Sequence, residues 1–261
     1  MSITNGSFIT DDLNSILTSY RTISLHEMEE SHLMSRFDEK YVFRISKLKD
    51  FLQKLQQHYR ILSVNHQLLA QYENLYFDTP ELKSYHDHHN DRATRYKIRF
   101  RRYTDSGDCF FEIKRKDNRG FTNKKRQSAK EFPKDLSDNQ QEFVKTTLQA
   151  DPGLLQPTLS NSFHRITLVN TGNRERLTLD IMIHFSNTAR KEYLDEVVIA
   201  EVKQERHFYE SAFKRLMQHE RIFPLSFSKY CMGTLLTHPG IKYNRFKPKL
   251  TVINKLRNEP S

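Results

Sequence analysis

The 261-residue sequence has no tryptophan, only seven glycines and only two cysteines. So few glycines, with no G-x-G-x-x-G or Walker-type run, argue against a glycine-rich nucleotide-binding fold. Cys109 and Cys231 lie far apart in the sequence and lack metal-ligand spacing, so a reduced, cytoplasmic protein is the simplest interpretation. Because no run of about 18 apolar residues is present, we expect no transmembrane segment. The N-terminus has no basic segment followed by an apolar core, so no secretory signal is predicted.

Positive charge is what the sequence has in excess. It contains 42 Lys and Arg residues against 32 Asp and Glu residues, which gives a net charge of +10. This excess predicts an anionic partner, and nucleic acid, acidic lipid and a phosphorylated small molecule all remain open. The chain is long enough for one large domain or two small ones.

One short stretch, RATRYKIRFRRY at 92–103, concentrates this charge. Alternate side chains of a strand point to opposite faces, so the stretch predicts a strand with one apolar-aromatic face and one cationic face. The cationic face carries Arg95, Lys97, Arg99 and Arg101. Four like charges on one face repel each other, and water, acidic neighbours or a polyanion must make that arrangement tolerable.

The same bias recurs on other predicted strands, where cations outnumber a few carboxylates. An antiparallel sheet with one wet face is the plain alternative, but a wet face usually mixes charges of both signs. If the sheet closes, the cations meet in a lumen, where unpaired charge is costly unless an anion is bound. The carboxylates would offer hard oxygen ligands to a divalent metal beside phosphate.

The periodicity predicts about eight strands and three or four helices, with antiparallel hairpins and no βαβ rhythm. We therefore expect an α+β fold with a large sheet or barrel. Thr10 and Ser46 are predicted to cap helices, Ser24 and Glu27 to form a capping box, and Leu48, Phe51, Leu52 and Leu55 to share a buried helix face. The last 20 residues are basic without a clear period and predict a partly ordered tail.

Six spaced motifs carry a family resemblance. They are Y-F-D-T-P with R-x-K-I-R-F-R at 76–101, F-E-I-K-R-K at 111–116, K-x-R at 124–126, R-L-T-L-D at 176–180, E-V-K at 201–203 and S-K-Y at 228–230. Together they resemble the VTC domain, the polyphosphate polymerase branch of the triphosphate tunnel (CYTH) superfamily, in its short bacterial form. Two positions depart from the family pattern: Asp38 replaces a Glu, and Phe163 replaces a Tyr.

The resemblance implies an antiparallel eight-stranded β tunnel or barrel with helices packed outside. The tunnel would occupy residues 36–238, preceded by a helical arm at 1–35 and followed by the basic tail at 239–261. The implied activity is metal-dependent transfer of the ATP γ-phosphoryl group to a growing polyphosphate chain. ATP and polyphosphate would be the partners and Mn²⁺ or Mg²⁺ the cofactor. Docking on a membrane protein agrees with the family, and the oligomeric state is left open.

By the same resemblance, the site residues fall into three groups. The catalytic group is Arg99, Arg101, Lys114, Arg165, Arg176 and Lys229. The phosphate-binding group is Lys40, Lys97, Lys116, Lys124, Arg126 and Lys203. The metal ligands would be Glu201, Glu112 and Asp180.

Two other functions remain open: hydrolysis of tripolyphosphate or nucleoside triphosphates in the same tunnel, and non-catalytic binding of polyphosphate or nucleic acid. Aromatic residues that lie mostly opposite the cations argue against nucleic acid. The run His86-Asp87-His88-His89 invites a metal site, although a solvated turn is favoured. Tyr76 and Tyr103 could stack on a base, although packing in the core is favoured.

Overall fold

A single curved sheet organises the protein. The computed structural model describes residues 5–30, 36–118, 121–148, 151–205 and 211–258. The sheet has 11 strands, eight of which form a path in the order β2-β11-β9-β8-β4-β5-β6-β7. These eight are β2 (Arg36–Arg44), β4 (Leu69–Asp78), β5 (Arg95–Tyr103), β6 (Cys109–Lys116), β7 (Thr122–Ala129), β8 (Gln156–Asn170), β9 (Glu175–Ser186) and β11 (Val197–Glu205).

Every neighbouring pair on this path is antiparallel. Three short strands attach beside it: β1 (Thr22–Ile23), β3 (Arg60–Leu62) and β10 (Lys191–Leu194). Strand β3 pairs with β8 and with β1, the latter in parallel, and β10 pairs with β9.

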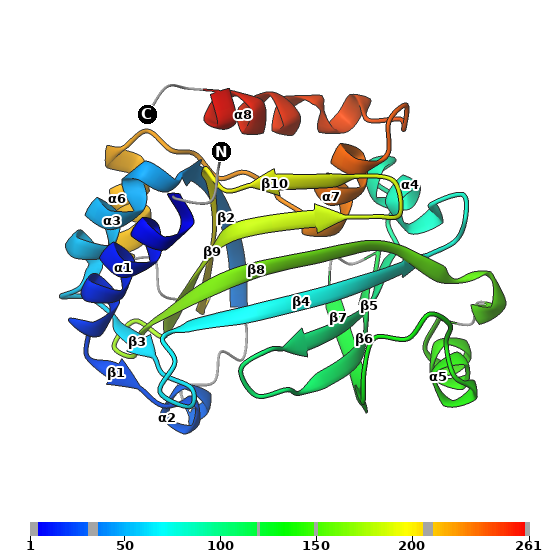
Figure 1. The fold of residues 1–261 in the computed structure, drawn as a ribbon, viewed down its shortest axis with the longest axis horizontal. Coiled ribbons are helices and arrows are strands. Elements are labelled where there is room, and N and C mark those ends of the chain that lie inside the picture. The colour runs from blue at the N-terminus through cyan, green and yellow to red at the C-terminus, as the bar shows by residue number, and fades with distance from the viewer. Residues whose placement is uncertain (1–4, 31–35, 119–120, 149–150, 206–210, 259–261) are drawn as a thin grey trace.

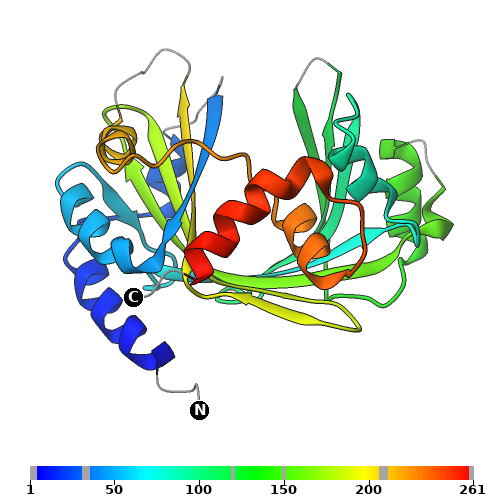
Figure 2. The ribbon, with the colours of Figure 1, turned by 90° about the horizontal axis from the view of Figure 1, so that it is seen from above.

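The sheet bends into a trough (Figure 2). Strands β2 and β11 form one arm, β6 and β7 rise on the other side, and the last two α-helices lie between the arms. In the described residues the pairing path ends at β2 and β7, so the sheet is open along that side. The expected α+β class, with a tunnel-like antiparallel sheet and helices packed outside it, is confirmed, and the last two α-helices lie inside the trough in addition.

Two helical layers cover the convex face (Figure 1). The first contains α1 (Asn5–Thr18), α3 (Leu48–Leu55) and α6 (Ala212–His219), and the second is α5 (Asp138–Leu148). As predicted, the apolar face of α3 is buried, and it packs with convex-face strand residues such as Phe43 and Leu179. Phe100 and Phe111 form the core beneath α5 together with Val144.

A third core fills part of the concave face. Helix α7 (Lys229–Thr237) lies directly on the sheet. Its Gly233 permits this close approach, since a Cβ at that position would come within 2.7 Å of Leu159 Cδ2. A register shift in the β8–β9 ladder accompanies Met182, whose φ is 51°. Beyond this bulge the alternation of β9 is reversed, so Ile181 belongs to the convex core and Ile183 to the concave one.

The predicted helix caps differ in outcome. Glu27 accepts hydrogen bonds from the Ser24 backbone N–H and hydroxyl, both at 2.8 Å, so the capping box of α2 (Leu25–Glu30) is confirmed. Thr10 lies inside α1 rather than at its N-cap. Ser46 belongs to the short helix η1 (Ile45–Lys47), and the N-cap of α3 is Lys47.

Two segments are more regular than predicted. The His-rich connection forms α4 (Lys83–His89), so the expectation of a solvated turn is wrong. The expected loose tail contains η3 (Asn244–Phe246) and α8 (Lys247–Asn258), and Phe246 and Ile253 are buried in the concave core. The remaining 3-10 helix is η2 (Pro152–Leu154). Within the described residues, no helix has the length and apolar character needed to cross a membrane.

Candidate active site

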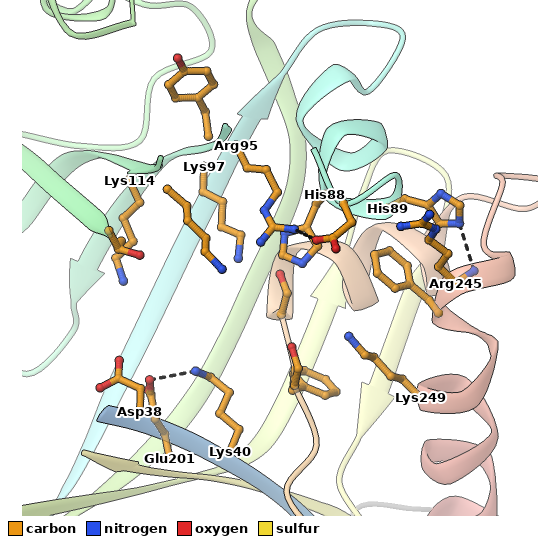
Figure 3. Close-up of a pocket in the computed structure, with 18 of the residues that line it drawn as sticks. Asp38, Lys40, His88, His89, Arg95, Lys97, Lys114, Glu201, Arg245 and Lys249 are labelled. Atoms are coloured by element: carbon orange, nitrogen blue, oxygen red, sulfur yellow. Dashed lines mark hydrogen bonds and ion pairs between the residues drawn. The ribbon is translucent and has the colours of Figure 1, made fainter. Parts of the chain in front are cut away.

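A cavity of about 1140 Å³ lies in the trough. Strands of both arms line it, together with α4, the segment before α7, and the η3–α8 segment (Figure 3). Its cationic lining residues are Lys40, Arg95, Lys97, Lys114, Lys116, Lys203, Arg245 and Lys249. Its carboxylates are Asp38, Asp91 and Glu201. The lining is therefore strongly biased towards positive charge.

Cross-strand register explains how the strands concentrate this charge. Lys97 of β5 lies opposite Lys114 of β6, which in turn lies opposite Lys124 of β7. Like charges directly opposite each other destabilise a sheet. Two residue pairs further along, Arg99 faces Glu112, so the same ladder also contains an attractive pair.

Three carboxylates on the concave face each bridge two cations. Three triads are formed: Arg99–Glu112–Lys124, Arg165–Asp180–Lys229 and Lys40–Glu201–Lys203. Charge-assisted hydrogen bonds of this kind are shorter and about twice as strong as neutral ones. The triads hold six of the predicted phosphate-binding or catalytic cations in place. The three bridging carboxylates are the residues that were predicted as metal ligands.

The oxygens of Glu112 and Asp180 are fully engaged. Glu112 accepts from Arg99 Nε and Nη2 through Oε2, at 2.9 and 2.6 Å, and pairs with Lys124 through Oε1. Asp180 accepts from Arg165 at 2.6 and 2.8 Å through its two oxygens and also binds Lys229. Burial raises the pKa of Glu112, but Arg99, Arg101 and Lys124 outweigh it and lower the pKa to about 2. Both carboxylates are therefore built into the protein as counter-charges.

Glu201 differs from the other two. Lys40 and Lys203 both contact its Oε1, at 2.9 and 3.2 Å, and its Oε2 takes part in neither pair. Burial raises its pKa, but Lys203 and Lys40 outweigh this and lower it below the ordinary range. Glu201 lines the cavity, as does Asp38, whose carboxylate lies 3.8 Å from Lys203 Nζ.

The three predicted metal ligands thus lie in three separate triads. In the described residues no group of three or more His, Cys, Asp or Glu side chains is placed to hold a metal. The described side chains therefore do not form a complete metal site without a ligand. Glu201 and Asp38 fit a divalent ion only if phosphate oxygens complete its coordination.

Three half-buried cations lack such a counter-charge. In the described structure, no ion pair with a carboxylate joins Lys97, Arg101 or Lys114. Burial, with Arg99, Lys203 and Arg101 nearby, lowers the pKa of Lys114 to about 6. Burial and neighbouring cations also lower the pKa of Lys97 and of Arg101. A bound anion would relieve this cost.

Aromatic rings support the guanidinium groups on the trough floor. Tyr72 lies 5.1 Å from the Arg101 guanidinium carbon and 5.0 Å from that of Arg165, and its ring stacks on Phe163. The expectation that aromatics lie opposite the cations therefore holds for β5 but is wrong for β4 and β8. These rings are covered by cations, an arrangement unlike an open stacking surface.

Of the remaining predicted residues, one lines the cavity and two do not, and the cations Arg99, Arg101, Lys124, Arg165 and Lys229 do not line it either. Lys116 lines the cavity and is exposed. Arg126 is exposed, with its guanidinium 4.5 Å from the Phe110 ring centre. Arg176 pairs in register with Lys203 but does not line the cavity, and its Nη1 lies 3.9 Å from Met28 Sδ. Tyr76 is buried and packs on Tyr230, which agrees with the core role favoured from the sequence.

Two cationic lining residues were not predicted from the sequence, and two histidines were considered there only as metal ligands. His88 and His89 reach the cavity from α4, and Arg245 and Lys249 from the C-terminal segment (Figure 3). The spacing of four residues between Arg245 and Lys249 was a usable helical signal. Nothing in the sequence showed that this segment turns back into the trough.

Comparison with known proteins gives one family match. Residues 35–238 match the family model described as the VTC domain. A search of curated proteins gave no match.

Solved structures with similar folds come from several organisms. A candidate adenylyl cyclase from Hippeastrum, described as having a dominant triphosphatase activity, is 13% identical with a TM-score of 0.48 over 81% of this chain and 100% of that chain. A candidate adenylate cyclase from Bacillus halodurans is 16% identical with a TM-score of 0.45, over 75% and 96%. Another, from Vibrio parahaemolyticus, is 14% identical with a TM-score of 0.43, over 76% and 99%. At these values the likeness says nothing about the activity of this chain.

Proposed function

The chain belongs to the VTC domain family, and we propose that it is a metal-dependent polyphosphate polymerase that transfers the γ-phosphoryl group of ATP to a growing polyphosphate chain. The observation that carries this proposal is the group of half-buried cations without a carboxylate partner in the described structure. Lys97, Arg101 and Lys114 lie beside cations that do have partners. The missing counter-charge is best supplied by a ligand with several phosphates in a row.

Phosphoryl transfer suits a site of this composition. It depends on positioning and on neutralising the phosphate oxygens far more than on covalent help from the protein. Arg99 and Arg165 present guanidinium forks that Glu112 and Asp180 hold in fixed orientations. Together with Lys229 and Lys114, they would bind the donor triphosphate and the acceptor end of the chain.

The choice of acceptor favours transfer to phosphate over hydrolysis. In the proposed step, a terminal oxygen of the acceptor chain forms a bond to the γ-phosphorus. The bond from that phosphorus to the β–γ bridging oxygen breaks, and ADP leaves with the electron pair. The acceptor oxygen is already anionic, so no base has to remove a proton from it. A water nucleophile would have to lose a proton. With the polyanion bound, the lysines and arginines around it are protonated and do not accept one.

The size of the cavity also supports a chain substrate. Pockets for drug-sized ligands measure about 300–1,000 Å³. The cavity here, at about 1140 Å³, is larger and carries cations on both arms. It therefore has room for phosphate groups beyond one triphosphate.

Glu201, together with Asp38, would hold Mn²⁺ or Mg²⁺ next to the bound phosphates. Such an ion would neutralise phosphate oxygens during transfer. Lys40 and Lys203 fix the Glu201 carboxylate from one oxygen and keep it ionised, so that its other oxygen can face the ligand.

Incubating the purified protein with ATP and Mn²⁺ tests the proposal. Acid-stable phosphate chains, formed in step with ADP, are the expected product. Orthophosphate without chains would assign the protein to triphosphate hydrolysis instead. Tight polyphosphate binding with no turnover would make it a binding module. Glu201→Gln, incubated in parallel, controls for contaminating enzymes, because its chain formation should be lost.

A further inference from the structure

One wall of the cavity lies outside the matched family domain. The match ends at residue 238, whereas Arg245, Phe246 and Lys249 line the cavity from η3 and α8. In Figure 3, Lys249 extends from α8 towards the interior of the cavity, and Arg245 lies beside His89. The C-terminal segment thus contributes charge to a site that the family domain does not complete by itself.

Specific contacts dock this segment on α4. The Tyr85 hydroxyl donates to the Lys242 carbonyl at 2.9 Å, and the Arg245 backbone N–H donates to His89 Nε2 at 3.3 Å. The Phe246 ring packs edge-on against Tyr85 and His89, with centroid distances of 5.7 and 5.2 Å. Because both polar contacts and buried rings hold the segment, the position of Lys249 is set by the fold.

The charge at this end of the cavity is again unbalanced. Among the described residues, Asp91 is the carboxylate that lines this end of the cavity, and it forms an ion pair with Arg95. Burial, with Lys97, Arg95 and Lys249 adding to it, lowers the pKa of His88 to about 3, so this histidine is neutral. Burial likewise lowers the pKa of Lys249. Around His88 the cations Arg95, Lys97 and Lys249 therefore outnumber Asp91, and the potential there is positive.

We propose that Arg95, Arg245 and Lys249 form a second anion subsite, the α8 subsite, which binds phosphate groups of the chain beyond the three that occupy the donor site. This inference rests on the proposed function. It assigns the C-terminal helix a role in selecting long chains over short ones. The same lining that binds a triphosphate on β5 and β6 continues through Lys97 to Lys249, so one linear polyanion can contact both.

Metal-free calorimetry with tripolyphosphate and with a longer, size-selected polyphosphate tests the subsite. The unmodified protein should bind the longer chain more tightly. Lys249→Gln should lose about tenfold in affinity for the longer chain, the size expected for one charge-assisted contact. Its affinity for tripolyphosphate should change less than about twofold. Lys247→Gln, an exposed position on the same helix that does not line the cavity, is the matched control and should leave both affinities unchanged.

Phe246→Ala provides a second route, because it removes the ring that docks η3 on α4. It should reproduce the selective loss for the longer chain. Equal losses for both ligands in Lys249→Gln would place Lys249 in the donor site and overturn the subsite. Unchanged affinities in Lys249→Gln would overturn it as well. Both results leave the proposed function standing, whereas failure of the unmodified protein to bind either ligand would overturn the function itself.

Discussion

The two arms of the trough treat their charges differently. On the β2–β11 arm, Glu201 bridges Lys40 and Lys203, and Asp38 lies 3.8 Å from Lys203 Nζ, so two carboxylates match two cations. On the β5–β6 arm, Lys97 and Lys114 face each other across the ladder, and no carboxylate pairs with either in the described structure. One arm is electrostatically complete without a ligand, and the other is not.

This difference separates the part of the site that is fixed from the part that binds. Removing charge from water costs several kcal/mol per ion unless a partner compensates for it. The balanced arm meets that cost internally, and the unbalanced arm leaves it unmet until an anion arrives. A ligand that binds only the folded protein then adds its binding free energy to stability. Substrate binding should therefore stabilise this protein strongly.

The largest expected effect comes from Glu201→Gln on the balanced arm. Metal-dependent turnover should fall about 100-fold, as is typical for losing one charged group at the reacting centre. Metal-free tripolyphosphate affinity should be retained or improved, because a negative charge leaves the cavity. Turnover and calorimetry together check this. Full activity in the variant would refute the assignment of Glu201 as a metal ligand.

A second prediction sets one arm against the other. Lys114→Met should weaken tripolyphosphate binding by about tenfold or more, since a charged contact is lost. It should also raise the melting temperature of the free protein, because the change removes an amino group that burial holds away from water with no carboxylate partner in the described structure.

Lys203→Met is the matched change on the balanced arm. It removes a partner of Glu201, so the melting temperature should fall rather than rise. Scanning calorimetry of both variants measures the two melting temperatures. Melting temperatures that shift in the same direction would show that the two arms do not differ as described.

Asp180→Asn should have a smaller effect on turnover and a clear effect on stability. The change deprives Arg165 and Lys229 of their shared counter-charge, and breaking a buried pair costs about 3–5 kcal/mol. Turnover should fall a few-fold, while the metal concentration for half-maximal activity stays the same. A higher metal requirement would restore Asp180 as the metal ligand that the sequence predicted.

The fold was predictable where short-range patterns determine it. The alternation in β5 correctly predicted which side chains share a face, and the spacing of Leu48, Phe51, Leu52 and Leu55 identified α3. Helix α8 was missed because its apolar residues, Leu250, Ile253 and Leu256, are sparse among lysines. They become buried only against a concave core that residues distant in the sequence assemble.

The site was predictable as a set of cations but not as a set of pairs. Strand parity placed Lys97 and Lys114 on the concave face, and the motifs added Arg165 and Lys229. Parity does not reveal that Asp180 joins Arg165 to Lys229, because that triad requires α7 to lie inside the trough. For the same reason, the sequence could not separate Glu201 from carboxylates whose oxygens are already occupied.

The smallest expected effect is the uptake of protons when tripolyphosphate binds. In the free protein the pKa of Lys114 is about 6, because of burial and the nearby cations Arg99 and Lys203. A bound polyanion raises this pKa, so at about pH 7 the lysine is mostly neutral before binding and protonated afterwards. Tripolyphosphate binding should therefore take up protons, which calorimetry in buffers of different ionisation enthalpy measures.

The direction of the Lys114 pKa shift also determines how the stability of the folded protein depends on pH. Between the folded value of about 6 and the ordinary 10.5, the unfolded chain binds more protons than the folded protein at Lys114. The Lys114 contribution to the stability of the free protein therefore rises with pH across that window. Lys114→Met should flatten this rise and reduce proton uptake by up to about one proton per tripolyphosphate bound. Unchanged uptake in that variant would mean that Lys114 is already paired in the free protein, and the contrast between the two arms would lose its strongest member.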